Sequence, residues 1–137
     1  MSRITSRFGM RTTALEAVEG LNLTGLKAIV TGASAGLGVE TARALAVAGA
    51  EVVLAVRDPA AGERVAASIA GNAPRGRTVV DRLDLADLDS VRAFVGRHAG
   101  APLNILVNNA GVMACPPQNT TQGFEMQIGV NHLGHFV

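Results

Sequence analysis

The chain has 137 residues, of which 48% are hydrophobic, and its formal net charge is +1. This is enough for one small domain with a buried core, and the interspersed charges argue against a nucleic-acid-binding surface. One cysteine, no apolar run long enough to cross a bilayer and no apolar stretch in the first 20 residues favour a cytoplasmic protein without a membrane span or secretory signal.

The hydrophobic pattern alternates strands with helices. In chain order we expect an arm over 1–22 with a short helix over 13–18, then a strand over 28–30, a helix over 37–48, a strand over 51–56, a helix over 60–70, a strand over 78–83, a helix over 91–98, a strand over 103–107 and a helix over 122–137. This alternation predicts an α/β fold, a doubly wound parallel sheet in the strand order 3-2-1-4. Residues 23–137 would form this Rossmann domain, incomplete at its carboxyl end.

Two of the expected helices each present a periodic face, and the face of the second is expected to point inward. The first carries Leu37, Thr41, Leu45 and Ala48, and the second carries Val91, Phe94 and Val95.

A glycine-rich turn joins the first strand to the following helix, with the sequence Thr-Gly-Ala-Ser-Ala-Gly-Leu-Gly over residues 31–38. Glycines allow a tight turn and a close ligand approach, and the helix directs free N–H groups and a partial positive charge at the turn. The turn therefore predicts a pyrophosphate site. Its spacing differs from the G-x-G-x-x-G fingerprint, and an ordinary tight turn is the alternative interpretation.

Three motifs occur in order along the chain: the glycine turn over 31–38, Asp84-Leu85, and Asn-Asn-Ala-Gly over 108–111. Together they resemble the short-chain dehydrogenase/reductase family, whose glycine motif is T-G-x-x-x-G-x-G. The arm motifs over 6–14 and the tail motifs over 123–136 are similar to its retinol-dehydrogenase and WW-domain-oxidoreductase branch. The resemblance implies an NADP-dependent oxidoreductase that interconverts alcohols and carbonyls by hydride transfer.

The resemblance also implies roles for single residues. The cofactor-binding residues that it indicates are Gly32, Ser34, Ala35, Gly36, Leu37, Gly38, Arg57, Asp84, Leu85, Asn109, Ala110 and Gly111. Asp84 would accept from the adenine amino group, and residues 109–111 would line the adenosine ribose. Asn108 would tie the fourth strand to its neighbours, and Asn131 matches the catalytic Asn of the proton relay. Alone, Asp84 would be a cap or turn residue and Asn131 an ordinary helix residue.

Arg57 follows the second strand, where an NAD enzyme places an acidic residue for the ribose 2′-hydroxyl. A guanidinium at this position can bind a 2′-phosphate, so NADP is predicted over NAD. A solvated loop charge is the alternative interpretation of Arg57, and Asp58 beside it weakens the NADP prediction.

The sequence has no Tyr, and its only Lys, Lys27, precedes the first strand. In the family the catalytic Ser, Tyr and Lys lie beyond the helix on which this chain ends, so the resemblance implies that they are absent, and we expect the chain to be inactive by itself. A small alcohol or carbonyl would be a substrate only of a longer parent protein. The alternatives are a catalytically dead nucleotide-binding or interaction module and a truncated gene product without function.

Self-association through the final helix or the uncovered fourth strand is also expected. His132, His135 and Cys115 could suggest a metal site, but no second ligand pair supports one, so no metal is predicted. His98 is interpreted as a residue that favours the helix dipole.

Overall fold

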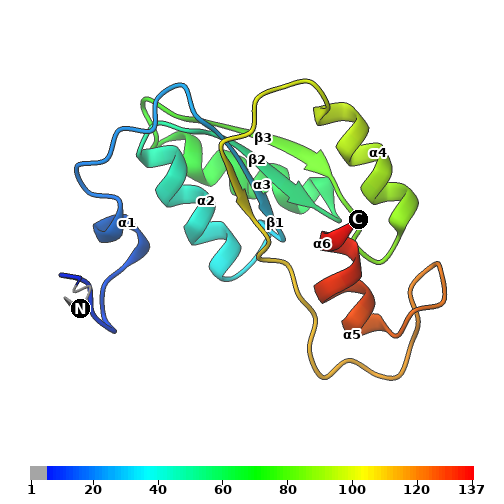
Figure 1. Ribbon diagram of the computed structural model, residues 1–137. Helices are drawn as coiled ribbons and strands as arrows, with labels where there is room; N and C mark the ends of the chain where they lie inside the picture. Colours follow the sequence, from blue (N-terminus) through cyan, green and yellow to red (C-terminus); the bar gives the residue numbers. More distant parts are fainter. Residues whose placement is uncertain (1–5) are drawn as a thin grey trace, which may run out of the picture.

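The computed structural model describes residues 6–137, which contain a four-stranded parallel sheet in the order β3-β2-β1-β4 (Figure 1). The strands are β1 (Lys27–Thr31), β2 (Glu51–Val56), β3 (Arg77–Arg82) and β4 (Ile105–Val107). The helices are α1 (Ala14–Ala17), α2 (Leu37–Val47), α3 (Pro59–Ala70), α4 (Leu88–His98), α5 (Met126–Ile128), the π-helical turn η1 (Gly129–Leu133) and α6 (Gly134–Phe136). The predicted fold class and strand order are confirmed. Residues 1–5, the beginning of the predicted arm, lie outside the described residues.

The two central strands are buried on both faces, which is why they consist of almost continuous apolar runs. Val30 and Leu54 belong to a core formed with α2 and α3, whereas Ile29 and Val53 belong to a core formed with α4 and η1. Neighbouring residues of each strand therefore serve opposite faces. The two cores thus hold the carboxyl ends of these strands in place.

One packing prediction is wrong, and one residue of the other helical face is exposed. Val91 and Phe94 are buried as expected, but Val95 is 54% exposed, because the inner face of α4 continues instead through His98, whose ring lies 4.5 Å from that of Phe94. Leu37 is 80% exposed. It is the first residue of α2 and precedes the part of the helix that packs on the sheet.

The last helix begins at Met126 rather than at residue 122. A tight turn occupies the preceding residues, where Asn119 and Glu125 form an antiparallel bridge and Gly123 has a φ of +85°. The Glu125 carboxylate then accepts hydrogen bonds from the second and third helical N–H groups. This side chain fixes the helix start, because a cap satisfies donors that have no partner within the helix.

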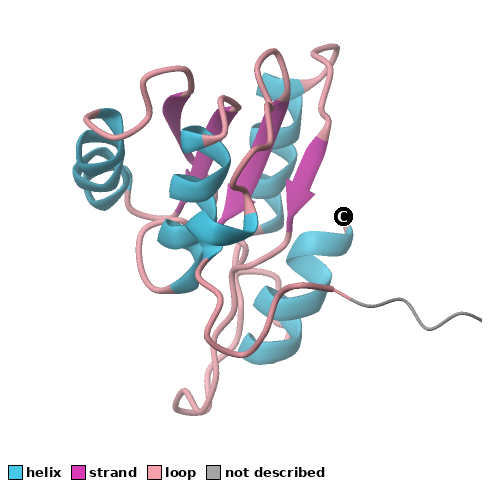
Figure 2. Cartoon of the chain, turned by 90° about the vertical axis from the view of Figure 1, so that its left-hand side faces the viewer, coloured by secondary structure: helices cyan, strands magenta, loops and turns pink. Residues whose placement is uncertain are grey.

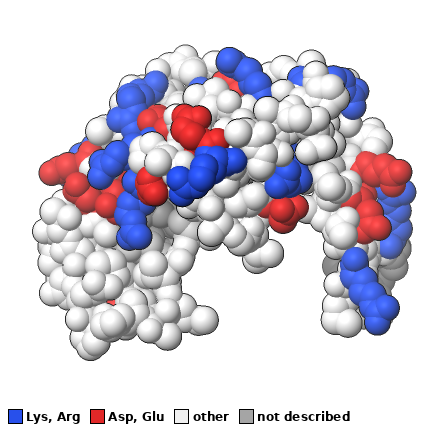
Figure 3. Space-filling model, turned by 180° about the vertical axis from the view of Figure 1, so that it is seen from behind, with Lys and Arg blue, Asp and Glu red and all other residues white. Residues whose placement is uncertain are grey.

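The fourth strand is also shorter than predicted. Asn104 lies before β4, and its side chain, rather than a backbone carbonyl, accepts from the N–H of Lys27 at 2.9 Å. In the described chain β4 pairs only with β1. Figure 2 shows the loop after β4 extending away from the sheet before the chain returns as the final helix. Residues 99–137 contain one charged residue, Glu125, and the lobe they form is nearly white in Figure 3.

Candidate nucleotide-binding cleft

A cleft of about 360 Å³ lies at the carboxyl ends of the parallel strands, the edge where α/β sheets bind ligands. The predicted cofactor residues that line it are Gly32, Ser34, Arg57, Asp84, Leu85, Asn109, Ala110 and Gly111. The predicted residues outside its lining are Ala35, Gly36, Leu37, Gly38 and Asn131. Four separate segments of sequence therefore meet in one cleft: the glycine turn, the end of β2, the turn after β3 and the loop after β4.

The three glycines of the turn are required for different structural reasons. A Cβ on Gly32, whose φ is +66°, would lie 2.9 Å from the Cα atom of Ala110. Gly38 also has no room for a side chain. Gly36 has a φ of +60°, but a Cβ there would meet nothing within 4 Å. Gly36 thus permits the backbone conformation and leaves open space before α2.

The beginning of α2 is suited to an anion. Gly36 is its N-cap residue, and no side chain caps the helix. The N–H of Val39 donates to the Gly36 carbonyl oxygen at 3.2 Å. The N–H groups of Leu37 and Gly38 are therefore the ones that need a partner from outside the helix. With the partial positive charge of an 11-residue helix behind them, these donors fit a pyrophosphate.

The loop after β4 is locked to the end of β1. The Thr31 hydroxyl accepts from the backbone N–H of Asn109 at 3.0 Å and of Ala110 at 2.9 Å. The Asn109 side chain donates to the carbonyl oxygen of Thr31 at 2.8 Å. Asn109 is thus the residue whose amide reaches back to β1, and the predicted role of Asn108 in tying the strand to its neighbours stays a prediction.

Asp84 begins the turn between β3 and α4. Its Oδ1 atom accepts from the N–H of Ala86 at 3.0 Å, and its own N–H donates to the Ser90 hydroxyl at 3.0 Å. Asp84 therefore shapes the turn while it lines the cleft. The turn-residue interpretation and the ligand-binding interpretation of Asp84 are compatible.

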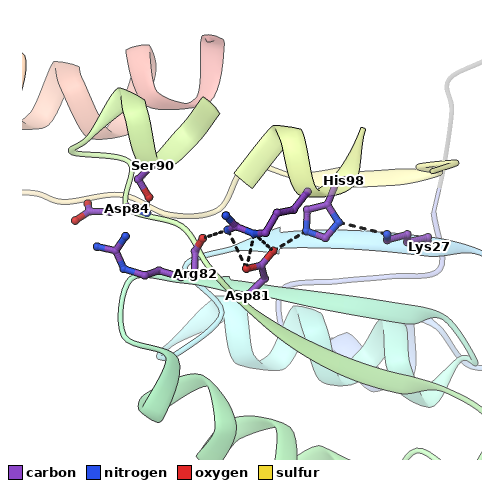
Figure 4. Close-up of polar contacts among 7 residues, drawn as sticks. Lys27, Asp81, Arg82, Asp84, Ser90 and His98 are labelled. Atoms are coloured by element: carbon purple, nitrogen blue, oxygen red, sulfur yellow. Dashed lines mark hydrogen bonds and ion pairs between the residues drawn. The ribbon is translucent and has the colours of Figure 1, made fainter. Parts of the chain in front are cut away.

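A polar network fixes α4 to the sheet near this turn (Figure 4). Asp81 accepts from Arg97 Nε with both oxygens at 3.1 Å, and its Oδ2 lies 2.9 Å from His98 Nε2. Lys27 Nζ lies 3.4 Å from His98 Nδ1. Because ammonium groups only donate, Nδ1 accepts and Nε2–H donates to Asp81. Partial burial raises the pKa of Asp81, but hydrogen bonds from Arg97 and His98 bring it below its ordinary value. The sequence missed this role of His98.

Arg57 and Asp58 follow β2, and their side chains differ in whether they already have a bonding partner. Asp58 Oδ1 accepts from the N–H of Ala60 at 2.9 Å and so caps α3. Arg57 is exposed, lines the cleft and forms no ion pair with any residue of the described chain. The guanidinium is therefore available to a ligand, whereas one carboxylate oxygen of its neighbour is occupied.

Asn131 joins the final helix to the loop after β4. Its Oδ1 accepts from the N–H of Val112 at 2.7 Å, and its Nδ2 donates to the Val112 carbonyl at 2.8 Å. Asn131 lies in η1, and π-helical turns are frequent at functional sites. It is therefore more than an ordinary surface residue of a helix.

Several lining residues were not found from the sequence: Gln118, Met126 and Val130. They come from the loop after β4 and from the final helix, and no local motif marks them. Among residues 6–137 no three metal-ligating side chains come together. No helix in this part of the chain is long and apolar enough to cross a membrane.

Comparison with known proteins shows the family to which the chain belongs. The family model described as short chain dehydrogenase matches residues 26–137. Retinol dehydrogenase 12 from Mus musculus is 47% identical over 119 residues, which are 85% of this chain and 38% of that protein. The chain thus spans well under half the length of this relative.

Two solved structures are also similar. An uncharacterized protein from Mycobacterium paratuberculosis is 44% identical with a TM-score of 0.78, over 91% of this chain and 43% of that one. A metagenomic short-chain oxidoreductase in complex with NADP is 34% identical with a TM-score of 0.70, over 83% of this chain and 53% of that one. The likeness to retinol dehydrogenase 12 agrees with the retinol-dehydrogenase-like branch that the sequence motifs indicate.

Proposed function

Because this chain belongs to the short-chain dehydrogenase family, we propose that it is the NADP(H)-binding part of an oxidoreductase for alcohols and carbonyls. The observation that carries the proposal is the cleft, where the glycine turn, Arg57, Asp84 and residues 109–111 meet. The relative solved in complex with NADP supports the choice of cofactor. When bound, the nicotinamide supplies or accepts a hydride.

Each part of the cleft suits one part of such a dinucleotide. The uncapped N–H groups at the start of α2 bind the pyrophosphate, and Gly36 leaves the space that it needs. Asp84 accepts from the adenine amino group, with Leu85 beside it. Residues 109–111 line the adenosine ribose, and the Thr31 hydroxyl holds their backbone in place.

The charges at the end of β2 favour NADP(H) over NAD(H). Arg57 offers its guanidinium to a 2′-phosphate without first breaking an ion pair. Asp58 would repel that phosphate, but its carboxylate is held by the first turn of α3. We therefore expect attraction to prevail.

The chain alone does not supply the proton that must reach or leave the substrate oxygen. It contains no Tyr, and Lys27 is bonded to His98 beside α4 rather than in the cleft. Asn131 matches the family's relay Asn, but in this chain it has no acid to serve. Turnover, and with it the alcohol or carbonyl substrate, is thus a property of a longer protein.

Calorimetric titration of the 137-residue protein with NADPH and NADH tests the proposal. We expect NADPH to bind and 2′,5′-ADP to compete with it, because the adenosine half of the site lies in this chain. The same preparation should oxidise no alcohol and reduce no aldehyde. Failure of both cofactors to bind would overturn the assignment, and cofactor-dependent turnover would overturn the predicted inactivity.

A further inference from the structure

We propose that His135 is a positioning residue for the nucleotide-binding loop and that it acts through the Thr31 hydroxyl. The inference concerns the cleft assigned above and therefore rests on the proposed function. His135 was considered from the sequence only as a metal ligand. In the structure its Nε2 atom lies 2.9 Å from Oγ1 of Thr31, which is 104 residues away in sequence.

The hydrogen bonds of the Thr31 hydroxyl determine the tautomer of His135. A hydroxyl has two acceptor lone pairs and one proton to donate. The N–H groups of Asn109 and Ala110 use both lone pairs. The hydroxyl proton therefore goes to His135 Nε2 at 2.9 Å rather than to the Val107 carbonyl at 3.4 Å. Nε2 is the acceptor, and the ring proton is on Nδ1, which lies 3.4 Å from the Asn131 carbonyl oxygen.

Protonation of His135 disturbs this arrangement. The new proton on Nε2 would face an oxygen whose lone pairs are already occupied. The Thr31 hydroxyl must then turn toward Val107 and release one of the backbone N–H groups that it holds. Those groups belong to the loop that lines the cleft, so the neutral imidazole maintains the geometry of the loop.

The surroundings of His135 favour the neutral form. The groups within hydrogen-bond distance of its ring nitrogens are the hydroxyl of Thr31 on β1 and the carbonyl of Asn131 on η1, and neither is charged. Burial lowers the pKa of His135 below its ordinary value, and the Asn131 carbonyl only partly opposes this effect. The loop should therefore be intact at neutral pH and loosen in acid.

The first test needs no nucleotide. Long-range ¹H–¹⁵N spectra of the free protein should show His135 protonated on Nδ1. The backbone amide signals of Asn109 and Ala110 should shift with pH at the same midpoint as the His135 ring. An Nε2–H tautomer, or amide signals that do not follow the ring, would overturn the inference even if the cofactor assignment is correct.

The second test is NADPH affinity between pH 5.5 and 8.0. His135→Leu should weaken binding about three- to tenfold at pH 7.5, the loss expected for one hydrogen bond, and His135→Gln should recover most of it through its side-chain oxygen. Below pH 6.5 the ratio of the NADPH affinity of the wild type to that of His135→Gln should fall. This ratio cancels titration of the 2′-phosphate.

Exposed His132, three residues away, provides the control. His132→Gln should keep the affinity and the pH profile of the wild type. Thermal melting of each variant separates an unfolded protein from one that binds weakly. A His135→Gln profile parallel to the wild type would overturn the role of His135, whereas no binding by the wild type at pH 7.5 would overturn the proposed function instead.

Discussion

A Cβ atom on Gly38 would lie 2.6 Å from Nδ2 of Asn109, and equally close to the carbonyl oxygen of Gly32. That Nδ2 atom donates to the Thr31 carbonyl. The first turn of α2 therefore lies directly against the amide that joins β4 to β1. Gly38 thus serves the assembly of the cleft even though it does not line it.

Gly38→Ala should destabilise the protein by about 1–3 kcal/mol, because the added methyl group must displace backbone or a bonded amide. Gly96→Ala is the control: Gly96 is also helical, but a Cβ there meets nothing within 4 Å. That change should stabilise the protein by up to about 1 kcal/mol. Urea unfolding monitored by circular dichroism measures both, and equal effects would contradict the close contact.

Arg57→Ala should reduce the preference for NADPH over NADH. A charge-assisted contact to a phosphate contributes about 1.5–3 kcal/mol, so the wild type should prefer NADPH by roughly ten- to hundredfold. The variant should lose most of that preference and keep its affinity for NADH.

Asp58→Asn is the matched change, since Asn also caps helices but carries no charge. It should leave α3 intact and strengthen NADPH binding modestly. Equal affinities of the wild type for the two cofactors would refute the assignment of Arg57.

Asp81→Asn should weaken the attachment of α4 to the sheet in a pH-dependent way. The folded-state pKa of Asp81 lies below its ordinary value of 3.8, so the carboxylate contributes its full stabilisation above that pH. This contribution is lost as the pH falls through the lower, folded value. At pH 7 the change should cost about 1–2 kcal/mol, and the difference from the wild type should vanish in strong acid.

Asp89→Asn provides the comparison for Asp81. Its ion pair with Arg92 is solvent-exposed, with side chains that are 80% and 62% accessible. Removing such a pair should cost less than about 0.5 kcal/mol. Unfolding free energies of the two variants between pH 2.5 and 7 test both statements, and a pH-independent loss for Asp81→Asn would contradict the role of its charge.

The sheet was predictable because its central strands are buried runs and because glycines mark the turn after β1. The rest of the cleft depends on contacts that leave no local pattern. Which of Asn108 and Asn109 reaches β1 is decided by a single alternation in side-chain direction. Met126 and Val130 line the cleft from a final helix that begins at residue 126 rather than at residue 122. Thr31 and His135 lie at opposite ends of the chain, so only the fold reveals their hydrogen bond.

The last prediction concerns the open edge of β4. This strand pairs only with β1 in the described chain, and its central residue Leu106 is 55% exposed. An unpaired, apolar strand edge without a charge can pair with another chain. The surrounding lobe cannot oppose this by repulsion, because Glu125 is the only charged residue over 99–137. We therefore expect the 137-residue protein to self-associate.

Leu106→Lys should reduce this self-association, because an ammonium group at the edge would be brought close to its own copy in any strand-to-strand pair. Val95→Lys is the control: Val95 is 54% exposed, nearly as much as Leu106, but lies on α4. It adds the same charge away from the edge, so it should leave the association unchanged. Size-exclusion chromatography with light scattering decides the matter. A wild-type monomer of 14.0 kDa with a cooperative thermal transition would contradict the prediction. Equal suppression by both variants would show that net charge, rather than the β4 edge, controls the association.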